Sequence, residues 1–278
     1  MIVCYARGGG LGHLTRVRAY LHTVHPGEPA EILTAWPERL PGASELVVDA
    51  FPAGLDGELS RRTVPPGVRV VHLARLLRWD AYRPLIPDDP VRFDRTYLVE
   101  EITGPHLAFL GSVSRAVTPL TLADPPAPSA TPVSDRLRGA WLIVHAGPPG
   151  EVMDLVAYAR ETAALEGLSP VFVLVSPAAP PGLPADVAHL DARPAWPLFR
   201  SAGRIVSAAG FNVVRQAAPY RHKHRLLPFP RRFDDQFARA ARVRADQPPR
   251  AVSGEHVSGE HPLSGEHALG AELRGGLG

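Results

Sequence analysis

The sequence predicts an α/β protein with two Rossmann-like domains, because a strand–loop–helix pattern occurs in both parts of the chain and a proline-rich stretch separates them. Short continuous apolar runs, typical of strands covered on both faces of a parallel sheet, alternate with segments whose apolar residues recur at helical spacing. This alternation favours parallel sheets with crossover helices. We therefore expect two such domains that face each other across a cleft.

The first domain is predicted to span residues 1–123. Met1–Ala6 is an apolar run that indicates a buried strand, and a glycine cluster follows it. From His13 onward the apolar residues recur at the spacing of one helix face. Three further strands are expected, and a helix is expected within 97–110, where Gly104-Pro105 would interrupt it. The expected strands cover 31–35, 45–51 and 68–74, and an apolar segment at 116–122 closes this half.

A linker and a second domain are predicted to follow. Residues 124–138 form the linker, since four prolines between 124 and 132 exclude a helix or a central strand. The second domain, 139–248, repeats the alternation. Its expected strands cover 140–145, 170–176, 204–207 and 225–229, and its expected helices cover 151–167, 212–218 and 234–244.

The end of the chain, 249–278, is predicted to be a disordered tail outside the fold. It carries three copies of Ser-Gly-Glu-His and then a glycine-rich run, with too few large apolar residues to bury a core. Its histidines and glutamates suggest weak metal binding at most, and a solvated low-complexity extension is the simpler interpretation.

Composition excludes several classes of function. The chain has 278 residues and a formal net charge of +2, which does not predict a nucleic-acid partner. A single cysteine, Cys4, excludes an internal disulfide framework and a cysteine-based zinc site. No stretch approaches the roughly 18 apolar residues of a membrane span. We expect a cytoplasmic protein without a membrane span and leave peripheral membrane association open.

The first candidate site is the loop Gly8–Gly12 with His13 behind it. Glycines after a first strand let a ligand approach the backbone closely, and the next helix presents free N–H groups. The dinucleotide fingerprint does not fit, because its third glycine would fall at His13, so a nicotinamide or flavin site is disfavoured. A histidine at this junction can accept a proton from a hydroxyl or from water. A helix-capping role without chemistry is the alternative.

The second candidate site combines two strand-to-helix loops of the second domain. Gly210 lets phosphate oxygens reach backbone amides, and Asn212 and Gln216 share one helix face. Arg231 or Arg232 would hold a diphosphate. Ordinary turn chemistry with solvated arginines is the alternative interpretation. The loop 145–150 is a further candidate for the diphosphate, although Glu151 in the first turn of its helix would repel phosphate.

Two carboxylates of the first domain, Asp49 and Glu58, are candidates for catalysis or for supporting a catalytic residue, since Asp49 ends a buried strand. The chain contains no Asp-x-Asp triplet. That pattern can hold a divalent ion on a diphosphate. We therefore expect no metal site, and a bound diphosphate would instead be stabilised by helix N-termini, backbone amides and arginine.

These motifs together resemble the GT-B glycosyltransferase superfamily, which includes MurG-like and UDP-sugar transferases, over about residues 1–245. The segment Val48–Leu59 is also similar to bacterial proteins identified as predicted glycosyltransferases. The resemblance implies transfer of a sugar from a nucleotide-sugar, UDP-linked, to an acceptor hydroxyl, with His13 as the base and no further cofactor. It implies an acceptor-side loop containing Gly10, Gly12 and Thr15, and a donor site containing Gly210, Asn212, Gln216, Arg231, Arg232, Asp235 and Gln236.

The sequence departs from this family at Gln216. The family usually has a glutamate there, which binds the ribose hydroxyls, and a neutral amide binds them more weakly. Both halves are also short for such a transferase. Two alternatives therefore stay open. One is a nucleotide-sugar hydrolase that uses water as the acceptor, and the other is a non-catalytic nucleotide-sugar-binding protein.

Overall fold

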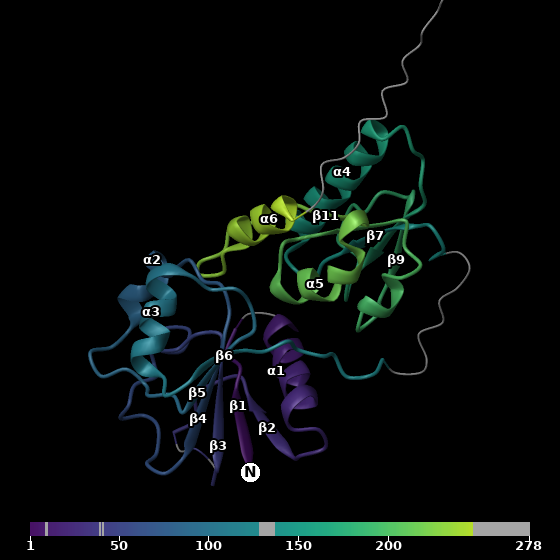
Figure 1. The fold of residues 1–278 in the computed structure, drawn as a ribbon. Coiled ribbons are helices and arrows are strands. Elements are labelled where there is room, and N and C mark those ends of the chain that lie inside the picture. Colours follow the sequence, from purple (N-terminus) through teal and green to yellow (C-terminus); the bar gives the residue numbers. More distant parts are fainter. Residues whose placement is uncertain (9–10, 39, 41, 128–136, 247–278) are drawn as a thin grey trace, which may run out of the picture. The chain divides into compact units, whose positions relative to one another are not determined.

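A computed structural model describes residues 1–8, 11–38, 40, 42–127 and 137–246. The predicted tail and most of the predicted linker lie outside the described residues. Met1–Gln247 forms one compact unit, which contains two sheets with only parallel strand pairs. The predicted α/β class with parallel sheets is therefore confirmed (Figure 1).

The first sheet has six strands in the order β2-β1-β3-β4-β5-β6. Its strands are β1 (Ile2–Tyr5), β2 (Ala30–Leu33), β3 (Glu45–Asp49), β4 (Arg69–Ala74), β5 (Arg95–Leu98) and β6 (Val117–Pro119). The helices of this half are α1 (Leu11–Val24), α2 (Trp79–Tyr82), which continues into a 3-10 turn (Arg83–Leu85), and α3 (Gly104–Val113). All strands point the same way, so their carboxyl ends share one edge of the sheet.

Side chains pack against both faces of the central strands, and this explains why the sequence of β1 is one continuous apolar run. Ile2 and Cys4 pack against Val17 and Tyr20 of α1 on one face. The alternate residues of β1 pack on the other face in a second cluster, to which Val113 of α3 also belongs. A strand between two apolar layers needs apolar residues at every position, rather than at every second one.

The second sheet has five strands in the order β11-β10-β7-β8-β9. Its strands are β7 (Trp141–Val144), β8 (Phe172–Val175), β9 (Val187–Leu190), β10 (Arg204–Ser207) and β11 (His224–Leu226). The helices are α4 (Pro149–Leu165), α5 (Phe211–Gln216) and α6 (Gln236–Ala245), and 3-10 turns cover Trp196–Leu198 and Ala218–Lys223. Leu155 and Ala159 of α4 pack on one face of this sheet, and Leu198 and Ala217 pack on the other.

One predicted helix is confirmed in part. Within the expected range 97–110 the helix α3 begins at Gly104, and residues 97 and 98 belong to the strand β5. Gly104 has a φ of +63°, and Pro105 stands in the first turn of the helix, where its missing N–H removes no helical hydrogen bond. The Gly-Pro pair therefore begins this helix instead of interrupting it. The strand β9 was not predicted at all.

Buried ion pairs connect α6 and the turn before it to the first sheet. Arg239 of α6 donates to both carboxylate oxygens of Glu100, at 2.5 and 2.8 Å, and to Asp234 at 2.9 Å. Asp234 also pairs with Arg75, which directly follows β4. Burial alone would raise the pKa of Asp234, but the Arg75 and Arg239 charges lower it to about 2. This group of four charged residues is called the buried network below.

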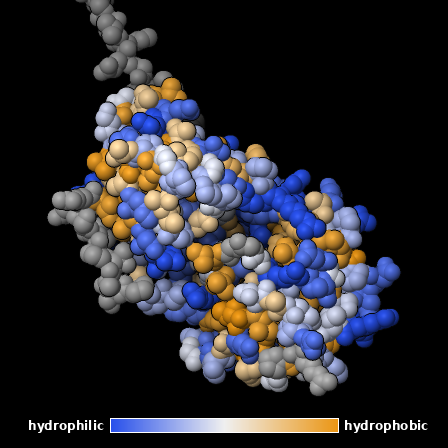
Figure 2. Space-filling view, turned by 180° about the vertical axis from the view of Figure 1, so that it is seen from behind, coloured by the Kyte–Doolittle hydropathy of each residue, from blue (hydrophilic) through white to orange (hydrophobic). Residues whose placement is uncertain are grey.

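The surface mixes hydrophilic and hydrophobic residues, and the orange groups on the face seen in Figure 2 are separated by blue ones. Seven large apolar residues are exposed among those described: Met1, Leu11, Leu107, Leu165, Leu168, Val171 and Phe237.

Within the described part of the chain, no helix has the length and apolar character needed to cross a membrane.

Candidate functional site

The centre of the candidate site is a histidine–aspartate pair at the carboxyl edge of the first sheet. His13 lies in the first turn of α1, and Asp49 is the last residue of β3. His13 Nδ1 lies 2.6 Å from Asp49 Oδ2. Because a carboxylate only accepts hydrogen bonds, Nδ1 carries the proton, and Nε2 is left as the basic nitrogen of the neutral ring.

Arg16 completes this arrangement, which we call the first triad. His13 and Arg16 are three residues apart and therefore share one face of α1. Arg16 donates to Asp49 Oδ1 from Nε at 2.5 Å and to Oδ2 from Nη2 at 2.6 Å. Arg16 Nη2 also lies 3.1 Å from His13 Nδ1, but both nitrogens carry protons, so this contact is not a hydrogen bond.

The first triad is almost entirely removed from solvent. The Asp49 side chain has no exposed surface, and those of Arg16 and His13 are 3% and 12% exposed. Burial alone would raise the pKa of Asp49, but the Arg16 charge and the hydrogen bonds from His13 and Arg16 hold it well below its usual range. Asp49 therefore stays ionised, fixes the tautomer of His13 and stabilises a proton on its ring.

Glycine and phenylalanine position the His13 ring. A Cβ added at Gly8 would collide with His13 Nε2, so the ring lies directly over the backbone of this loop residue. The ring centroid of Phe51 is 5.7 Å from that of His13. Gly10, which was assigned to the predicted acceptor-side loop together with Gly12, lies outside the described residues. Thr15 donates to the carbonyl of Leu11 at 3.0 Å, which is a bond internal to the helix.

Glu58, the other candidate carboxylate, takes a different place. It accepts hydrogen bonds from Tyr5 and Arg7 and from the backbone N–H groups of Leu55 and Asp56. Burial alone would raise the pKa of Glu58, and these bonds lower it. Its hydrogen bonds organise the loop after β3 instead of contacting His13.

The structure brings Asn212 of the predicted donor site next to Gly12 of the predicted acceptor-side loop. Asn212 Nδ2 donates to the carbonyl of Gly12 at 2.7 Å, across 200 residues of sequence. Asn212 Oδ1 is buried and has no hydrogen-bond partner among the described residues. Gly210 precedes α5, and a Cβ there would meet only Val213 at 3.9 Å, so the space beside it is open.

Gln216 contacts Asp124, the first residue of the predicted linker. Its Nε2 donates to Asp124 Oδ1 at 3.0 Å, and Arg215 donates to the same oxygen at 2.7 Å. The hydrogen bond uses an N–H group of the amide as its donor. An ionised glutamate in this place has no donor and could not make this bond to Asp124. Its side chain faces Asp124 in this structure.

Arg231 belongs to a second group of three residues, which we call the second triad. It donates to Glu151 Oε1 at 2.6 Å and to Oε2 at 2.5 Å, and His145 Nε2 lies 2.8 Å from the same Oε2. Burial alone would raise the pKa of Glu151, and Arg231 and His145 lower it; burial also lowers the pKa of His145. The expected repulsion of phosphate by Glu151 is thus offset by Arg231.

The other predicted donor residues have structural partners. Arg232 pairs with Asp56 of the first half at 3.1 Å. Asp235 caps α6 by accepting from the N–H of Ala238 at 2.9 Å. Gln236 is buried and accepts from the N–H of Phe229 at 3.1 Å.

The sequence analysis gave no role at the site to Arg16 and did not predict the pairings of the buried network. Arg16 was detectable, because it lies one helical turn after His13. The buried network was not detectable in the sequence. Arg75 and Asp234 are 159 residues apart, and Glu100 and Arg239 are 139 residues apart.

A cavity of about 510 Å³ lies at the same edge of the sheet, where α2 and α3 follow β4 and β5. Its lining residues are Trp79, Arg83, Ile86, Pro105, Ala108 and Phe109. Among the described residues no group of three or more histidine, cysteine, aspartate and glutamate side chains is arranged to hold a metal ion.

Comparisons with known proteins add no relative: no family model matches this chain, and no curated protein matches it.

Proposed function

We propose that this protein is a metal-independent glycosyltransferase that moves a sugar from a nucleotide-sugar, UDP-linked, to an acceptor hydroxyl. The first triad carries the proposal. A buried aspartate that fixes the histidine tautomer and leaves Nε2 basic is the arrangement that general-base catalysis requires. A helix-capping histidine would not need a buried, arginine-bound carboxylate behind its ring.

In the proposed reaction, His13 Nε2 takes the proton of the acceptor hydroxyl while the acceptor oxygen attacks the anomeric carbon of the sugar. The bond from this carbon to the β-phosphate oxygen breaks, and the nucleoside diphosphate leaves with that electron pair. Asp49 stabilises the imidazolium that forms. Arg16 keeps Asp49 ionised, so the proton stays on His13 until it passes to solvent.

The donor is proposed to bind beside Gly210, Asn212 and Gln216. The hydrogen bond between Asn212 and Gly12 brings this part of the second half next to the loop that precedes His13. Asn212 Oδ1 has no partner among the described residues, and because it is buried, a sugar hydroxyl would bond to it only after the Asn212 side chain turns toward the donor. Arg231 would offset the diphosphate charge once it exchanges one carboxylate oxygen of Glu151 for a phosphate oxygen.

The acceptor is proposed to bind on the side of the first sheet, in the cavity beside Trp79. Phe51 contacts His13, Tyr82 stacks on Phe51, and Trp79 lies next to Tyr82. These contacts form a chain of aromatic rings from the base to the cavity, in which Phe51 and Tyr82 are buried. An indole face with Arg83 nearby suits a ring-bearing or sugar acceptor.

The test is turnover of a panel of nucleotide-sugars by the wild type and by His13→Ala. We expect a loss of about a hundredfold or more in the variant, because general-base catalysis contributes about that much. His22→Ala is the matched control, since His22 is an exposed residue of the same helix. Near-normal turnover of His13→Ala would contradict the proposal.

The same assay without an acceptor separates the alternatives. Rapid release of free sugar into water would replace the transferase with a hydrolase that uses the same base. Donor binding by calorimetry with no turnover for any acceptor would instead identify a nucleotide-sugar-binding protein.

A further inference from the structure

A larger cavity, of about 710 Å³, lies at the opposite edge of the first sheet from His13. It is formed around the amino ends of β4 and β5, whereas Asp49 stands at the carboxyl end of β3. Its volume is within the roughly 300–1,000 Å³ typical of small-molecule sites. Its floor is apolar and includes the buried side chains of Val70, Val91 and Phe93. The proposed glycosyl transfer makes no use of this cavity.

Arginine dominates the rim of this cavity. Five of its fourteen lining residues are arginines and one, Asp94, is an acid. Three of these arginines have a carboxylate within 4.0 Å: Arg115 with Asp94, Arg69 with Glu45 and Arg62 with Asp89. Arg61 and Arg92 contact no carboxylate in the described part of the chain. The rim therefore carries two guanidinium groups whose charge no described side chain neutralises.

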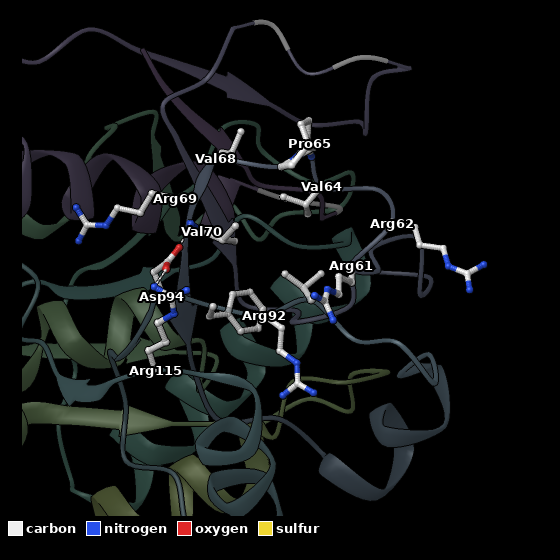
Figure 3. A pocket seen from close by; sticks show the side chains of 14 residues that line it. Arg61, Arg62, Val64, Pro65, Val68, Arg69, Val70, Arg92, Asp94 and Arg115 are labelled. Carbon is white, nitrogen blue, oxygen red and sulfur yellow. Dashed lines mark hydrogen bonds and ion pairs between the residues drawn. The ribbon is translucent and has the colours of Figure 1, made fainter.

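Arg61 and Arg92 stand on backbone that the fold holds in place. The N–H of Arg61 donates to the carbonyl of Asp89 at 3.0 Å, which connects the two loops that carry these arginines. Arg92 Nη1 donates to the carbonyl of Ser112 at 2.7 Å, at the end of α3. The other N–H groups of Arg92 stay available. Figure 3 shows Arg61 and Arg92 at the cavity and the Arg62 side chain extending away from it.

We propose that this cavity binds an organic phosphate with at least two negative charges, which Arg61 and Arg92 hold together. A guanidinium group binds phosphate through two parallel N–H bonds, and two such groups beside an apolar floor match a ligand that carries two negative charges on an organic body. Without such an anion the positive charges repel one another, so the anion should stabilise the folded chain. The site is independent of the proposed glycosyl transfer, because it lies at the other edge of the sheet.

The experiment measures binding of pyrophosphate to the full chain by calorimetry and by the shift in melting temperature. It compares the wild type with the double variant Arg61→Gln/Arg92→Gln. Arg62→Gln is the matched control, because Arg62 is on the same rim but points away and faces Asp89. A second arm measures co-sedimentation with vesicles of phosphatidylglycerol in phosphatidylcholine, since a lipid headgroup presents the same chemistry.

We expect the double variant to bind pyrophosphate at least tenfold more weakly than the wild type and the control to change by less than twofold. Arg231→Gln reports on the proposed donor site and should leave this binding in place. Vesicle binding that is lost in the double variant only, without pyrophosphate binding, would assign the phosphate to a lipid headgroup. Binding of neither probe, or equal binding by the double variant and the wild type, would overturn the proposal.

Discussion

The first and second triads are built from the same kinds of residue in the two halves of the chain. Each pairs a histidine ring nitrogen with a carboxylate that an arginine holds by two hydrogen bonds. In each, a glycine of the strand-to-helix loop lies against the histidine ring, and a phenylalanine centroid lies 5.7 Å from it.

The two triads differ in burial and in the nitrogen that faces the carboxylate. Asp49 is fully buried, whereas the side chains of Glu151 and Arg231 are 18% and 30% exposed. His13 uses Nδ1 and leaves Nε2 basic, and His145 uses Nε2. The first triad is therefore a fixed arrangement suited to proton transfer. In the second triad, the partly exposed Arg231 can exchange Glu151 for another anion. The predictions below test this distinction.

The largest expected effect is on stability, from Asp49→Asn. The amide leaves Arg16 as an uncompensated charge in a buried site, which costs about 3–5 kcal/mol of unfolding free energy. Glu151→Gln should cost about 1 kcal/mol or less, because its pair is partly solvated. Urea denaturation of both variants measures the difference. Equal losses would show that the two triads are equally dependent on their carboxylates.

The second prediction concerns the glycines that the histidine rings cover. Gly8→Ala places a methyl group where the His13 ring lies, and we expect kcat to fall about tenfold or more, since misplacing a catalytic group by about 1 Å can cost a hundredfold. Gly147→Ala disturbs His145 in the same way but does not touch the base, so its kcat should fall less.

Gly111→Ala controls for the extra methyl group, because a Cβ at that helical position meets nothing within 4 Å. Circular dichroism confirms that each variant folds. If Gly8→Ala kept full activity, the position of the His13 ring over the loop would be irrelevant to turnover.

The third prediction is a pH dependence. The folded-state pKa of Asp49 lies below the unfolded value of about 3.9, so its stabilisation is present above pH 4 and is lost as pH falls through the folded pKa. The stability difference between the wild type and Asp49→Asn should therefore narrow below pH 4, by up to about 1.4 kcal/mol per pH unit. Denaturation at pH 7, 4 and 3 measures it. A difference that is constant over this range would contradict an ionised Asp49.

The smallest expected effect is on donor affinity, from Glu151→Gln. Removing the carboxylate frees Arg231 to bind the diphosphate. Because a partly solvated ion pair contributes up to about 1 kcal/mol, its loss should strengthen donor binding by about fivefold at most. Calorimetry with the nucleoside diphosphate measures the gain in affinity. Glu161→Gln is the control, because Glu161 is an exposed residue of the same helix. Weaker binding in Glu151→Gln would place Arg231 outside the donor site.

The sequence predicted the strands well where the chain is buried on both faces. β1 and β7 are short apolar runs, and β10 has two apolar residues between Arg204 and Ser207; each of the three strands lies within one residue of its expected bounds. β9 was missed because two of its four residues, Ala188 and His189, are exposed, which interrupts the apolar signal. The start of α3 was not predicted, because a Gly-Pro pair can begin a helix as well as interrupt one.

The candidate site was predictable where it depends on local sequence. His13 and Asp49 were both selected, one for its place after a glycine loop and the other for its place at a strand end. The pairing of Arg231 with Glu151 was not predicted, since it joins residues 80 positions apart. Whether a polar residue meets a ligand or another side chain depends on such long-range partners, which periodicity does not reveal.

The buried network limits how the chain can be divided. Arg75 and Glu100 come from the first half, and their partners Asp234 and Arg239 come 159 and 139 residues later in the chain. A fragment that ends before residue 234 would keep two charged side chains in the interior without counter-ions. A chimaera that exchanges the first half for that of another protein must therefore bring an arginine and a glutamate to these two positions, or replace the last helix as well.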